Sequence, residues 1–365
     1  MVSFSLKPKC FIVDPYTQIG GGKVSQANLK LCVELTNNFS EVSYFNLEGN
    51  LFFSCISFFG FILNMNSNKF RNDIIIFQGI FELHYLIADL FLYNKKRLVI
   101  IPRGAFVPSI YRNTFINKPL LKILLWKVFI KKRFFDSGYW VTTSDLEQQR
   151  FAFIGANMQN SLIIPDSLNN NRLDNASFIP SKTFIESNYL LFVGRISKEK
   201  NLFFLIELMK RLVEKGLNKK LILLGPISDI RYYNSLVEKI NLYSLNEYII
   251  FRSAKTNLEL AEYYAKSDCV LLPSHIESFG LVILEAIQFS KVIFVSQNVP
   301  LNFISPLAGK QLNLDIEIWS CEIFNFYKQG INANVDYSKI LAKFSIEKIS
   351  ALWQNATKLL IDGRL

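Results

Sequence analysis

The part of the sequence that most constrains the fold is a short apolar run that leads through a polar loop into an amphipathic helix. The run covers residues 269–273, the loop carries Glu277, and a helical pattern that contains Glu285 follows Gly280. Strand, loop and helix in this order are typical of a parallel α/β unit, in which the loop lies above the carboxyl end of the strand. The two carboxylates are therefore expected to face the same space.

The start of this helix is expected to bind an anion. Amides in the first turn of a helix have no partner inside the helix, and the positive end of the helix dipole favours a phosphate. Carboxylates beside these amides accept hydrogen bonds from hydroxyls, such as those of a ribose or a hexose. The stretch therefore predicts a pocket for a sugar nucleotide. The residues expected to contact it are Glu277, Ser278, Phe279, Gly280, Leu281 and Glu285.

Length and composition predict two globular domains. A chain of 365 residues is long for a single domain, whereas two domains of about 170 residues each are of ordinary size. Half of the residues are hydrophobic and 33 are phenylalanine. The chain can therefore fill two cores, and this composition excludes a disordered protein.

The net charge of +11 favours an anionic partner, which could be a phospholipid surface, a nucleic acid or a phosphorylated substrate. The sequence contains neither a basic low-complexity tail nor a nucleic-acid-binding motif. We therefore expect a phospholipid surface or a phosphorylated substrate, and no nucleic-acid partner.

The cysteines and the apolar runs indicate a cytoplasmic protein. Five cysteines lie far apart and mostly within apolar runs, which is typical of buried free thiols in a reducing compartment. Residues 1–9 lack the apolar core of a signal peptide. The longest apolar run, residues 51–63, is shorter than the roughly 18 residues that a membrane-spanning helix needs. Its aromatic residues and Gly60 predict a buried strand region instead.

Strand-like runs alternate with helical patterns through both halves of the chain, which predicts parallel sheets covered by helices on both faces. In the first half, the expected strands are residues 9–14, 73–77, 97–101, 139–142 and 161–164, and the expected helices are residues 24–38, 80–94, 118–135 and 144–155. In the second half, strands are expected at residues 189–193, 219–224, 248–251, 269–273 and 292–296, with helices from residue 202, at 259–266 and from 342 onwards.

Three consecutive glycines follow the first expected strand, at residues 20–22. Glycine lets the backbone approach a ligand closely, so a strand, a glycine loop and a helix can together bind a phosphate. The spacing is not that of the dinucleotide-binding fingerprint. A simple turn is the alternative interpretation.

The stretch from Glu277 to Ala286 has the form Glu-x-Phe-Gly-Leu-x-x-x-Glu-Ala. It resembles the signature of the retaining glycosyltransferases of family 4, which have the GT-B fold. A second segment, residues 194–201, reads Gly-Arg-x-x-x-x-Lys-Asn after an expected strand and is similar to that family as well. The resemblance implies an α/β protein of two doubly wound, Rossmann-like domains that face a central cleft.

The resemblance also implies how the donor is held. Arg195 and Lys200 would stabilise the departing nucleotide diphosphate, which makes a metal ion or other cofactor unnecessary. Glu277 and the amides that follow it would hold the hexose and the distal phosphate, and Glu285 would hold the ribose. Glycines and one arginine complete the implied donor site: Gly21 and Gly22 at the diphosphate, Gly225 in the nucleotide pocket and Arg252 near the base.

Two positions in the first half are implicated on the acceptor side. Residues 102–105, Pro-Arg-Gly-Ala, resemble a Ser-Pro-Arg-Gly segment of family 4 enzymes that assemble surface polysaccharides, and Arg103 would then contact donor phosphate or acceptor. A turn with a surface arginine is the alternative. Gln78 stands where related enzymes often have a histidine, which removes an imidazole from the reacting centre. A further departure is Pro165-Asp-Ser in place of the family's usual Pro-Asn-Gly.

Residues 118–135 combine five lysines and an arginine with leucine, tryptophan and phenylalanine at helical spacing. Such a basic amphipathic helix can lie at an anionic membrane surface. A helix that buries its apolar side on the sheet is the alternative. Enzymes of the resembled family that act on lipid-linked acceptors use a basic region in this way, which favours membrane docking.

Together these patterns predict an acceptor-binding domain at residues 1–170, a linker at 171–187, a nucleotide-sugar domain at 188–335 and a closing helix at 336–365 that crosses back. The resemblance implies a retaining hexosyltransferase of O-antigen or capsule biosynthesis, with a glycan or lipid-linked acceptor, at the inner face of the cytoplasmic membrane. The alternatives are a GT-B nucleotide-sugar 2-epimerase, a non-catalytic GT-B subunit that binds a partner enzyme, and a nucleic-acid-binding protein. The sequence leaves the base, sugar, acceptor and linkage open.

Overall fold

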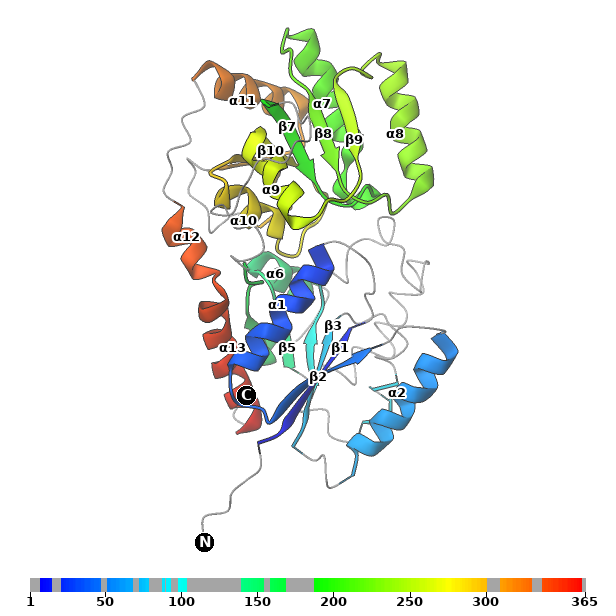
Figure 1. Ribbon diagram of the computed structural model, residues 1–365, viewed down its shortest axis with the longest axis vertical. Coiled ribbons are helices and arrows are strands. Elements are labelled where there is room, and N and C mark those ends of the chain that lie inside the picture. The colour runs from blue at the N-terminus through cyan, green and yellow to red at the C-terminus, as the bar shows by residue number, and fades with distance from the viewer. Residues whose placement is uncertain are drawn as a thin grey trace. The chain divides into compact units, whose positions relative to one another are not determined.

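The computed structural model (Figure 1) describes the chain in twelve stretches. These are residues 7–14, 21–46, 51–67, 72–78, 87–88, 90–92, 98–103, 139–153, 158–168, 187–300, 309–329 and 337–362. The chain divides into two compact units. The N-terminal unit comprises Met1–Gln18, Gly22–Ser167 and Ile346–Leu365, and the C-terminal unit comprises Ile19–Gly21 and Leu168–Ser345.

The N-terminal unit is built on a parallel six-stranded sheet with the order β2-β1-β3-β4-β5-β6. Its strands are β1 (Lys9–Asp14), β2 (Glu41–Asn46), β3 (Ile74–Gln78), β4 (Leu98–Ile101), β5 (Tyr139–Thr142) and β6 (Ser161–Ile163). The helices of this unit are α1 (Gly21–Leu35), α2 (Leu51–Met65), α6 (Asp145–Phe153), the 3-10 turn η5 (Met158–Asn160) and α13 (Ile346–Ile361).

Helices cover both faces of this sheet. On one face, α1 and α13 pack through Cys32 and Trp353 against strand residues that include Ile12 and Ile76. On the other face, α2 packs through Phe58 against strand residues such as Phe77. Figure 1 shows α2 on the side of the sheet away from α1 and α13. Because both faces are covered, β3, β4 and β5 consist entirely of buried residues.

The C-terminal unit contains a second parallel six-stranded sheet, with the order β12-β11-β10-β7-β8-β9. Its strands are β7 (Tyr189–Val193), β8 (Leu221–Leu224), β9 (Ile249–Arg252), β10 (Ser267–Leu272), β11 (Val292–Ser296) and β12 (Gly309–Leu312). Its helices are η8 (Lys198–Lys200), α7 (Leu202–Glu214), α8 (Ile230–Leu242), α9 (Asn257–Lys266), α10 (Leu281–Gln288), α11 (Ile316–Lys328) and α12 (Ser338–Lys343).

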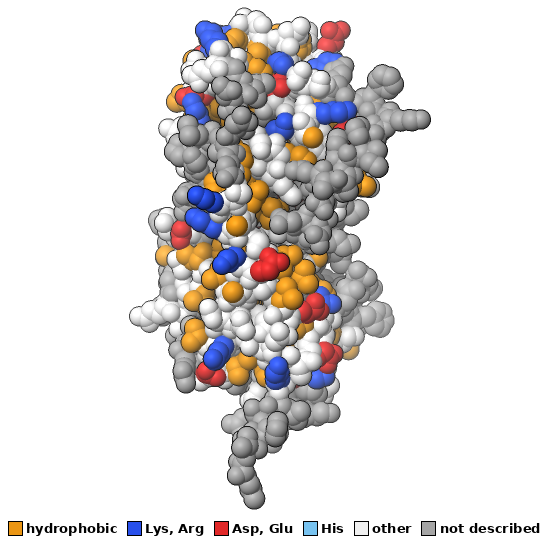
Figure 2. All heavy atoms as spheres, turned by 60° about the vertical axis from the view of Figure 1, so that its left-hand side comes forward, with side chains coloured by type: hydrophobic (Ala, Val, Ile, Leu, Met, Phe, Trp, Pro, Cys, Tyr) orange, Lys and Arg blue, Asp and Glu red, His pale blue; other side chains and the backbone are white. Residues whose placement is uncertain are grey.

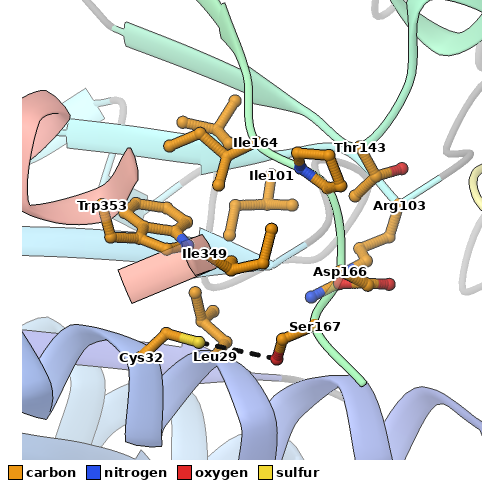
Figure 3. Close-up of a pocket in the computed structure, with 12 residues that line it drawn as sticks. Leu29, Cys32, Ile101, Arg103, Thr143, Ile164, Asp166, Ser167, Ile349 and Trp353 are labelled. Atoms are coloured by element: carbon orange, nitrogen blue, oxygen red, sulfur yellow. Dashed lines mark hydrogen bonds and ion pairs between the residues drawn. The ribbon is translucent and has the colours of Figure 1, made fainter. Parts of the chain in front are cut away.

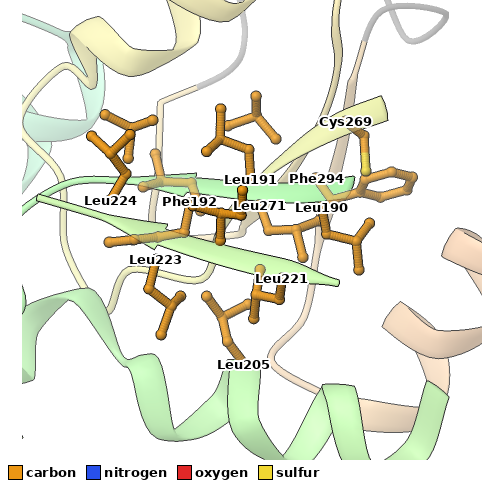
Figure 4. Close-up of a cluster of buried hydrophobic side chains, with 14 of the residues drawn as sticks. Leu190, Leu191, Phe192, Leu205, Leu221, Leu223, Leu224, Cys269, Leu271 and Phe294 are labelled. Carbon is orange, nitrogen blue, oxygen red and sulfur yellow. The ribbon is translucent and has the colours of Figure 1, made fainter. Parts of the chain in front are cut away.

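The core of the C-terminal unit is made of leucine-rich strands (Figure 4). Leu191, Phe192 and Leu271 come from the two central strands and are fully buried. Leu205 of α7 packs beneath them. The predicted α/β architecture of two doubly wound sheets is therefore confirmed.

The prediction of a buried strand region at residues 51–63 was wrong, because these residues lie in α2. The strand in this part of the chain is β2, which pairs in parallel with β1 and was not recognised. A chain that leaves one parallel strand and enters the sheet again in parallel needs a crossover, usually a helix. Residues 51–65 form that crossover between β2 and β3.

Other boundaries differ less from the sequence predictions. Helix α1 begins at Gly21, three residues before the predicted start at 24, and α8, α11 and β12 were not predicted. The predicted helix at 118–135 lies outside the described residues, as do most of the predicted helix at 80–94 and most of the linker at 171–187. Within the part of the chain that the structure describes, no helix is both long enough and apolar enough to span a bilayer.

The contact of α13 with the N-terminal sheet yields a stability prediction. Trp353 is 3% exposed and lies in the core formed with α1 and the sheet. Trp353→Ala should lower the free energy of unfolding of this unit by about 3–5 kcal/mol, because it removes buried area and leaves a cavity. Urea denaturation measures this change. The neighbouring Leu352 is 43% exposed, so Leu352→Ala should change the free energy by less than about 1 kcal/mol. Equal effects of the two variants would contradict the packing of α13.

Candidate functional site

The strand order of the C-terminal sheet locates its ligand-binding edge. β7 and β10 are neighbours at the centre, and the chain leaves β7 towards β8 but leaves β10 towards β11, on opposite sides. In open α/β sheets, ligands bind outside the carboxyl ends of the strands at such a switch point. The loops that follow β7 and β10 are the two segments singled out in the sequence, and they carry Arg195, Lys200 and Glu277.

A short turn after β7 positions the two cations. Residues 198–200 form the 3-10 turn η8, and Asn201 then takes a left-handed conformation, with φ 55° and ψ 47°, before α7 begins. α7 is held in place by its buried side, which includes Leu202, Leu205 and Met209. Asn201 donates its N–H to the carbonyl of Lys198 at 3.1 Å. The turn therefore presents Lys200 next to the carboxyl end of β7.

Lys200 and Glu277 form an ion pair between the two loops. The side chains are only 15% and 13% exposed, so neither charge is well solvated and each depends on the other. The hydroxyl of Ser274 donates to the same carboxylate oxygen of Glu277 at 2.9 Å. The structure thus brings together two of the predicted catalytic residues.

A backbone hydrogen bond also joins the two loops, beside an ion pair that lies within the loop after β7. Arg195 forms an ion pair with the carboxylate of Glu199 at 2.8 Å, and the guanidinium side chain is 40% exposed. The backbone N–H of His275 donates to the carbonyl of Glu199 at 2.9 Å. The loops after β7 and β10 are therefore linked through both backbone and side chains.

Helix α10 begins at Leu281, directly after Gly280, where the sequence predicted a helix to follow. Gly280 is its N-cap, with φ 86° and ψ 64°, a conformation that side chains with a Cβ rarely adopt. Phe279 is 3% exposed and packs against Phe344, with 5.5 Å between the ring centroids. Ser278 and Leu281 are half-buried on either side. Phe279 therefore anchors the loop in the core, while its neighbours lie closer to solvent.

Glu285 is buried in the second turn of α10, with 5% exposure. One carboxylate oxygen accepts a hydrogen bond from the hydroxyl of Tyr264 at 2.8 Å. Tyr264 is itself fully buried and stacks on Phe289 at 5.7 Å. The tyrosine fixes the orientation of a carboxylate that the sequence implicated in ribose binding.

Gly225 has a packing role at the carboxyl end of β8. Its φ is 154°, and a Cβ at this position would lie 1.9 Å from the carbonyl oxygen of Gly194. Only glycine lets the turns after β7 and β8 approach this closely. Pro226 then accepts a hydrogen bond from the N–H of Ile196 at 2.9 Å.

Arg252, at the end of β9, is exposed, and its side chain donates to the carbonyl of the preceding residue, Phe251, at 3.3 Å.

In the N-terminal unit, Gln78 is the last residue of β3, and Arg103 follows the end of the adjacent strand β4 by two residues. Arg103 has a left-handed backbone with φ 50°, and its Nη1 donates to both carboxylate oxygens of Asp166, at 2.6 and 2.7 Å. Its Nε donates to Gln78 Oε1 at 3.0 Å, and its Nη1 contacts the hydroxyl of Ser25. Gln78 is 1% exposed, and its Nε2 has no hydrogen-bond partner among the described residues.

A small pocket lies beside this cluster (Figure 3). Arg103 and Asp166 lie at one end of it, and Trp353 of α13 lies at the other. Cys32 donates weakly to the hydroxyl of Ser167 at 3.5 Å, and burial raises the pKa of its thiol. Asp166 stands at the position where the resembled family has asparagine, and its carboxylate neutralises Arg103. The polar residues of the pocket therefore bind one another, Arg103 to Asp166 and Cys32 to Ser167. All residues that line the pocket belong to the N-terminal unit.

The two predicted glycines, Gly21 and Gly22, form the first residues of α1 rather than a loop. The predicted site residues therefore fall into two groups, one on each unit. Arg195, Lys200, Glu277 and Glu285 gather on the C-terminal sheet, whereas Gln78 and Arg103 belong to the N-terminal sheet.

The sequence predicted no role for four residues that position the loops after β7 and β10 or the helix α10: Tyr264, Ser274, His275 and Ser296. The hydroxyl of Ser296 donates to the carbonyl of Ser274 at 2.5 Å, and both residues are fully buried. Burial lowers the pKa of the His275 imidazole below its ordinary value. His275 and Ser274 could have been found from their place next to Glu277. Tyr264 and Ser296 lie outside the sequence motifs, so no pattern in the sequence could have identified them.

Among the described residues, no group of three or more His, Cys, Asp or Glu side chains could hold a metal ion.

Comparison with known proteins points to one family. Residues 176–302 match the family model of the glycosyl transferases group 1. An uncharacterized glycosyltransferase of Methanocaldococcus jannaschii is 31% identical over 111 residues, which are 30% of this chain and 27% of that protein. The capsular polysaccharide biosynthesis glycosyltransferase CapM of Staphylococcus aureus is 26% identical over 162 residues, 44% of this chain and 40% of CapM.

Solved structures extend the similarity to both units. The Anabaena protein HepE, solved in complex with UDP and glucose, superposes with a TM-score of 0.74 over 96% of this chain and 99% of HepE, at 13% identity. At this identity the match shows the fold alone. Each of these two sequence matches covers less than half of the length of the curated relative. The chain therefore has the GT-B fold, and its segment 176–302 is similar to the glycosyl transferases group 1.

The close approach at Gly225 yields a prediction. Gly225→Ala should destabilise the C-terminal unit by about 3 kcal/mol or more, because its Cβ would overlap the Gly194 carbonyl and neither turn can yield without breaking its contacts. Gly216 is the matched control, since its φ is 86° and a Cβ added there would meet no atom within 4 Å. Gly216→Ala should cost only about 1–2 kcal/mol, from backbone strain. Equal melting temperatures for the two variants would contradict this packing role.

Proposed function

We propose that the protein is a retaining glycosyltransferase of family 4 that transfers a hexose from a nucleotide-diphosphate sugar to a glycan acceptor. The observation that carries the proposal is the meeting of Lys200 and Glu277 at the switch point between β7 and β10, with Arg195 beside them. Two cations, two carboxylates and a helix start at one sheet edge match the parts of a sugar nucleotide.

In this proposal Lys200 exchanges one anionic partner for another. Without donor, its charge is balanced by Glu277. A diphosphate offers more negative charge than one carboxylate, so Lys200 turns to the phosphates and Arg195 joins it from the same loop. Glu277 is then free to accept hydrogen bonds from the hexose hydroxyls. The segment Ser278–Gly280, which leads into α10, holds the distal phosphate, and Glu285 holds the ribose.

The reaction proceeds on one face of the sugar. The bond between the anomeric carbon and the phosphate oxygen breaks, and a bond to the acceptor oxygen forms on the same side. The acceptor hydroxyl gives its proton to the departing phosphate. Lys200 and Arg195 stabilise the charge that develops on the diphosphate, the role that a metal ion plays in other enzymes of this kind. We assign no separate general base, since Gln78 stands where related enzymes have a histidine.

The acceptor side is assigned to the N-terminal unit, near Gln78 and Arg103. Since Asp166 neutralises Arg103, we propose that this side contacts sugar hydroxyls rather than a charged group. The similarity to CapM, a capsular polysaccharide glycosyltransferase, supports surface-polysaccharide biosynthesis. The net charge of +11 and the basic segment 118–135 support a lipid-linked acceptor and a position at the inner face of the cytoplasmic membrane.

The second candidate is a non-catalytic GT-B subunit that binds a partner glycosyltransferase. Gln78 in place of the family histidine favours it. The donor-side residues favour the enzyme, because a subunit that binds no donor has no need for Lys200, Glu277 and Arg195 at one sheet edge.

Transfer with a panel of UDP-, GDP- and ADP-sugars tests the proposal, with and without chelator and with an undecaprenyl-diphosphate-linked sugar as acceptor. One donor should turn over, with or without the chelator. Lys200→Ala and Glu277→Gln should each lower kcat/KM about 100-fold or more, because each removes an interaction with the reacting sugar phosphate.

Lys198 is the matched control, since it lies in the same turn η8 but is exposed to solvent. Lys198→Ala should retain nearly full activity. If the wild type binds a nucleotide and turns over no donor, the binding-subunit function replaces the enzyme. A chain that binds none of the nucleotides has no donor site at this position.

A further inference from the structure

We propose that Tyr264 is a positioning residue for ribose recognition. Its buried hydroxyl orients the carboxylate of Glu285 for the 2′- and 3′-hydroxyls of a ribose, so that the site selects ribonucleotides over deoxyribonucleotides. This inference rests on the proposed function, in which Glu285 holds the ribose. It goes beyond that function because Tyr264 acts only through Glu285 and belongs to neither of the two sequence motifs.

The contact between Tyr264 and Glu285 lies inside the C-terminal unit. On the face that Figure 2 shows, acidic, basic and hydrophobic side chains are interspersed, which is ordinary for a protein surface. Tyr264 is instead 0% exposed and Glu285 5% exposed. A carboxylate removed from water needs hydrogen-bond donors, and the hydroxyl of Tyr264 donates to its Oε2 at 2.8 Å. The orientation of this carboxylate is therefore set by protein contacts and not by solvent.

Three contacts fix the position of Tyr264 itself. Its ring stacks on Phe289, the residue that follows α10, with 5.7 Å between the ring centroids and 13° between the planes. The hydroxyl of Ser267 donates to the carbonyl of Tyr264 at 2.9 Å. Nζ of Lys291 donates to the carbonyl of Ala265 at 2.8 Å. These contacts join the end of α9 to β10 and to the segment after α10, so the tyrosine hydroxyl has a fixed place beside Glu285.

The chemistry of the pair explains why a ribose is selected. A carboxylate only accepts hydrogen bonds and has room for several, so a bond from Tyr264 leaves acceptor sites for two neighbouring hydroxyls. The last torsion of a glutamate side chain has no sharp preference. The tyrosine hydroxyl, and not the rotamer of Glu285, therefore decides how the carboxylate is turned. A site built to bind a hydroxyl rejects an analogue that lacks it, because the buried polar group is left unpaired.

Calorimetric titration with pairs of nucleotides tests the proposal. The probes are UDP, GDP and ADP, each compared with its 2′,3′-dideoxy counterpart. The wild type should bind one ribonucleotide about tenfold or more tightly than the dideoxy form. Tyr264→Phe keeps the ring and its stacking but removes the hydroxyl. It should weaken binding of the ribonucleotide about fivefold or more and leave the affinity for the dideoxy form unchanged. The ratio of the two affinities therefore falls.

Two further variants control this result. Tyr263 precedes Tyr264 on α9 and is also buried, with 4% exposure. Tyr263→Phe removes the same group from the neighbouring residue and should leave the ratio as in the wild type. Glu285→Gln should lower the ratio by itself, and adding Tyr264→Phe to Glu285→Gln should lower it no further, because the two residues act as one unit.

The outcomes separate this inference from the proposed function. If Tyr264→Phe weakens binding of both nucleotides equally, Tyr264 only supports the fold, and the inference is overturned while the donor site stands. The same follows if Tyr263→Phe changes the ratio as much as Tyr264→Phe does. A wild type that binds the ribonucleotide and the dideoxy form equally has no ribose recognition to position. A wild type that binds none of the nucleotides overturns the proposed function as well.

Discussion

The ion pair between Lys200 and Glu277 is the interaction on which the proposed donor site depends. Its partners are 77 residues apart and lie on the loops after the two central strands of the C-terminal sheet. Both side chains are mostly shielded from water, so separating them without a replacement leaves an unpaired buried charge. In the proposed function, a diphosphate is such a replacement for Lys200, and a hexose hydroxyl is one for Glu277. The same contact would then both hold the two loops together and be exchanged for substrate.

The remaining contacts of the site fix the positions of these two loops. The Gly225 turn approaches the Gly194 turn so closely that no side chain fits between them, and Tyr264 holds Glu285 from the adjacent helix. Ser296 supports the backbone of Ser274 from β11. Each of these groups is buried, so the shape of the edge is fixed by packing and hydrogen bonds before any ligand arrives. Arg195, with 40% of its side chain exposed, is less buried than Lys200 and Glu277.

Much of the C-terminal unit could be predicted because its signals are local. The run 189–193 coincides with β7, and the motif residues Lys200 and Glu277 follow their strands directly. In the N-terminal unit, the prediction of a strand region at residues 51–63 was wrong, because a helix that is buried on one side and apolar on the other has the composition of a buried strand. Long-range contacts, such as that of Asp166 with Arg103 or of Tyr264 with Glu285, could not be predicted from a single sequence, because pairing between distant side chains leaves no local pattern. The position of Gln78 and Arg103 at strand ends was predictable, but the neutralisation of Arg103 was not.

We propose that Lys200 exchanges Glu277 for the donor diphosphate, and calorimetric titration with a nucleoside diphosphate tests this exchange most directly. The titration compares the wild type, Glu277→Gln and Lys200→Ala, using the base that supports transfer. If the claim holds, Glu277→Gln binds the nucleoside diphosphate at least as tightly as the wild type, because Lys200 no longer has a competing carboxylate, while Lys200→Ala binds about tenfold more weakly or worse. A folded Glu277→Gln variant that loses as much affinity as Lys200→Ala would contradict it, since the ion pair would then be a structural contact only.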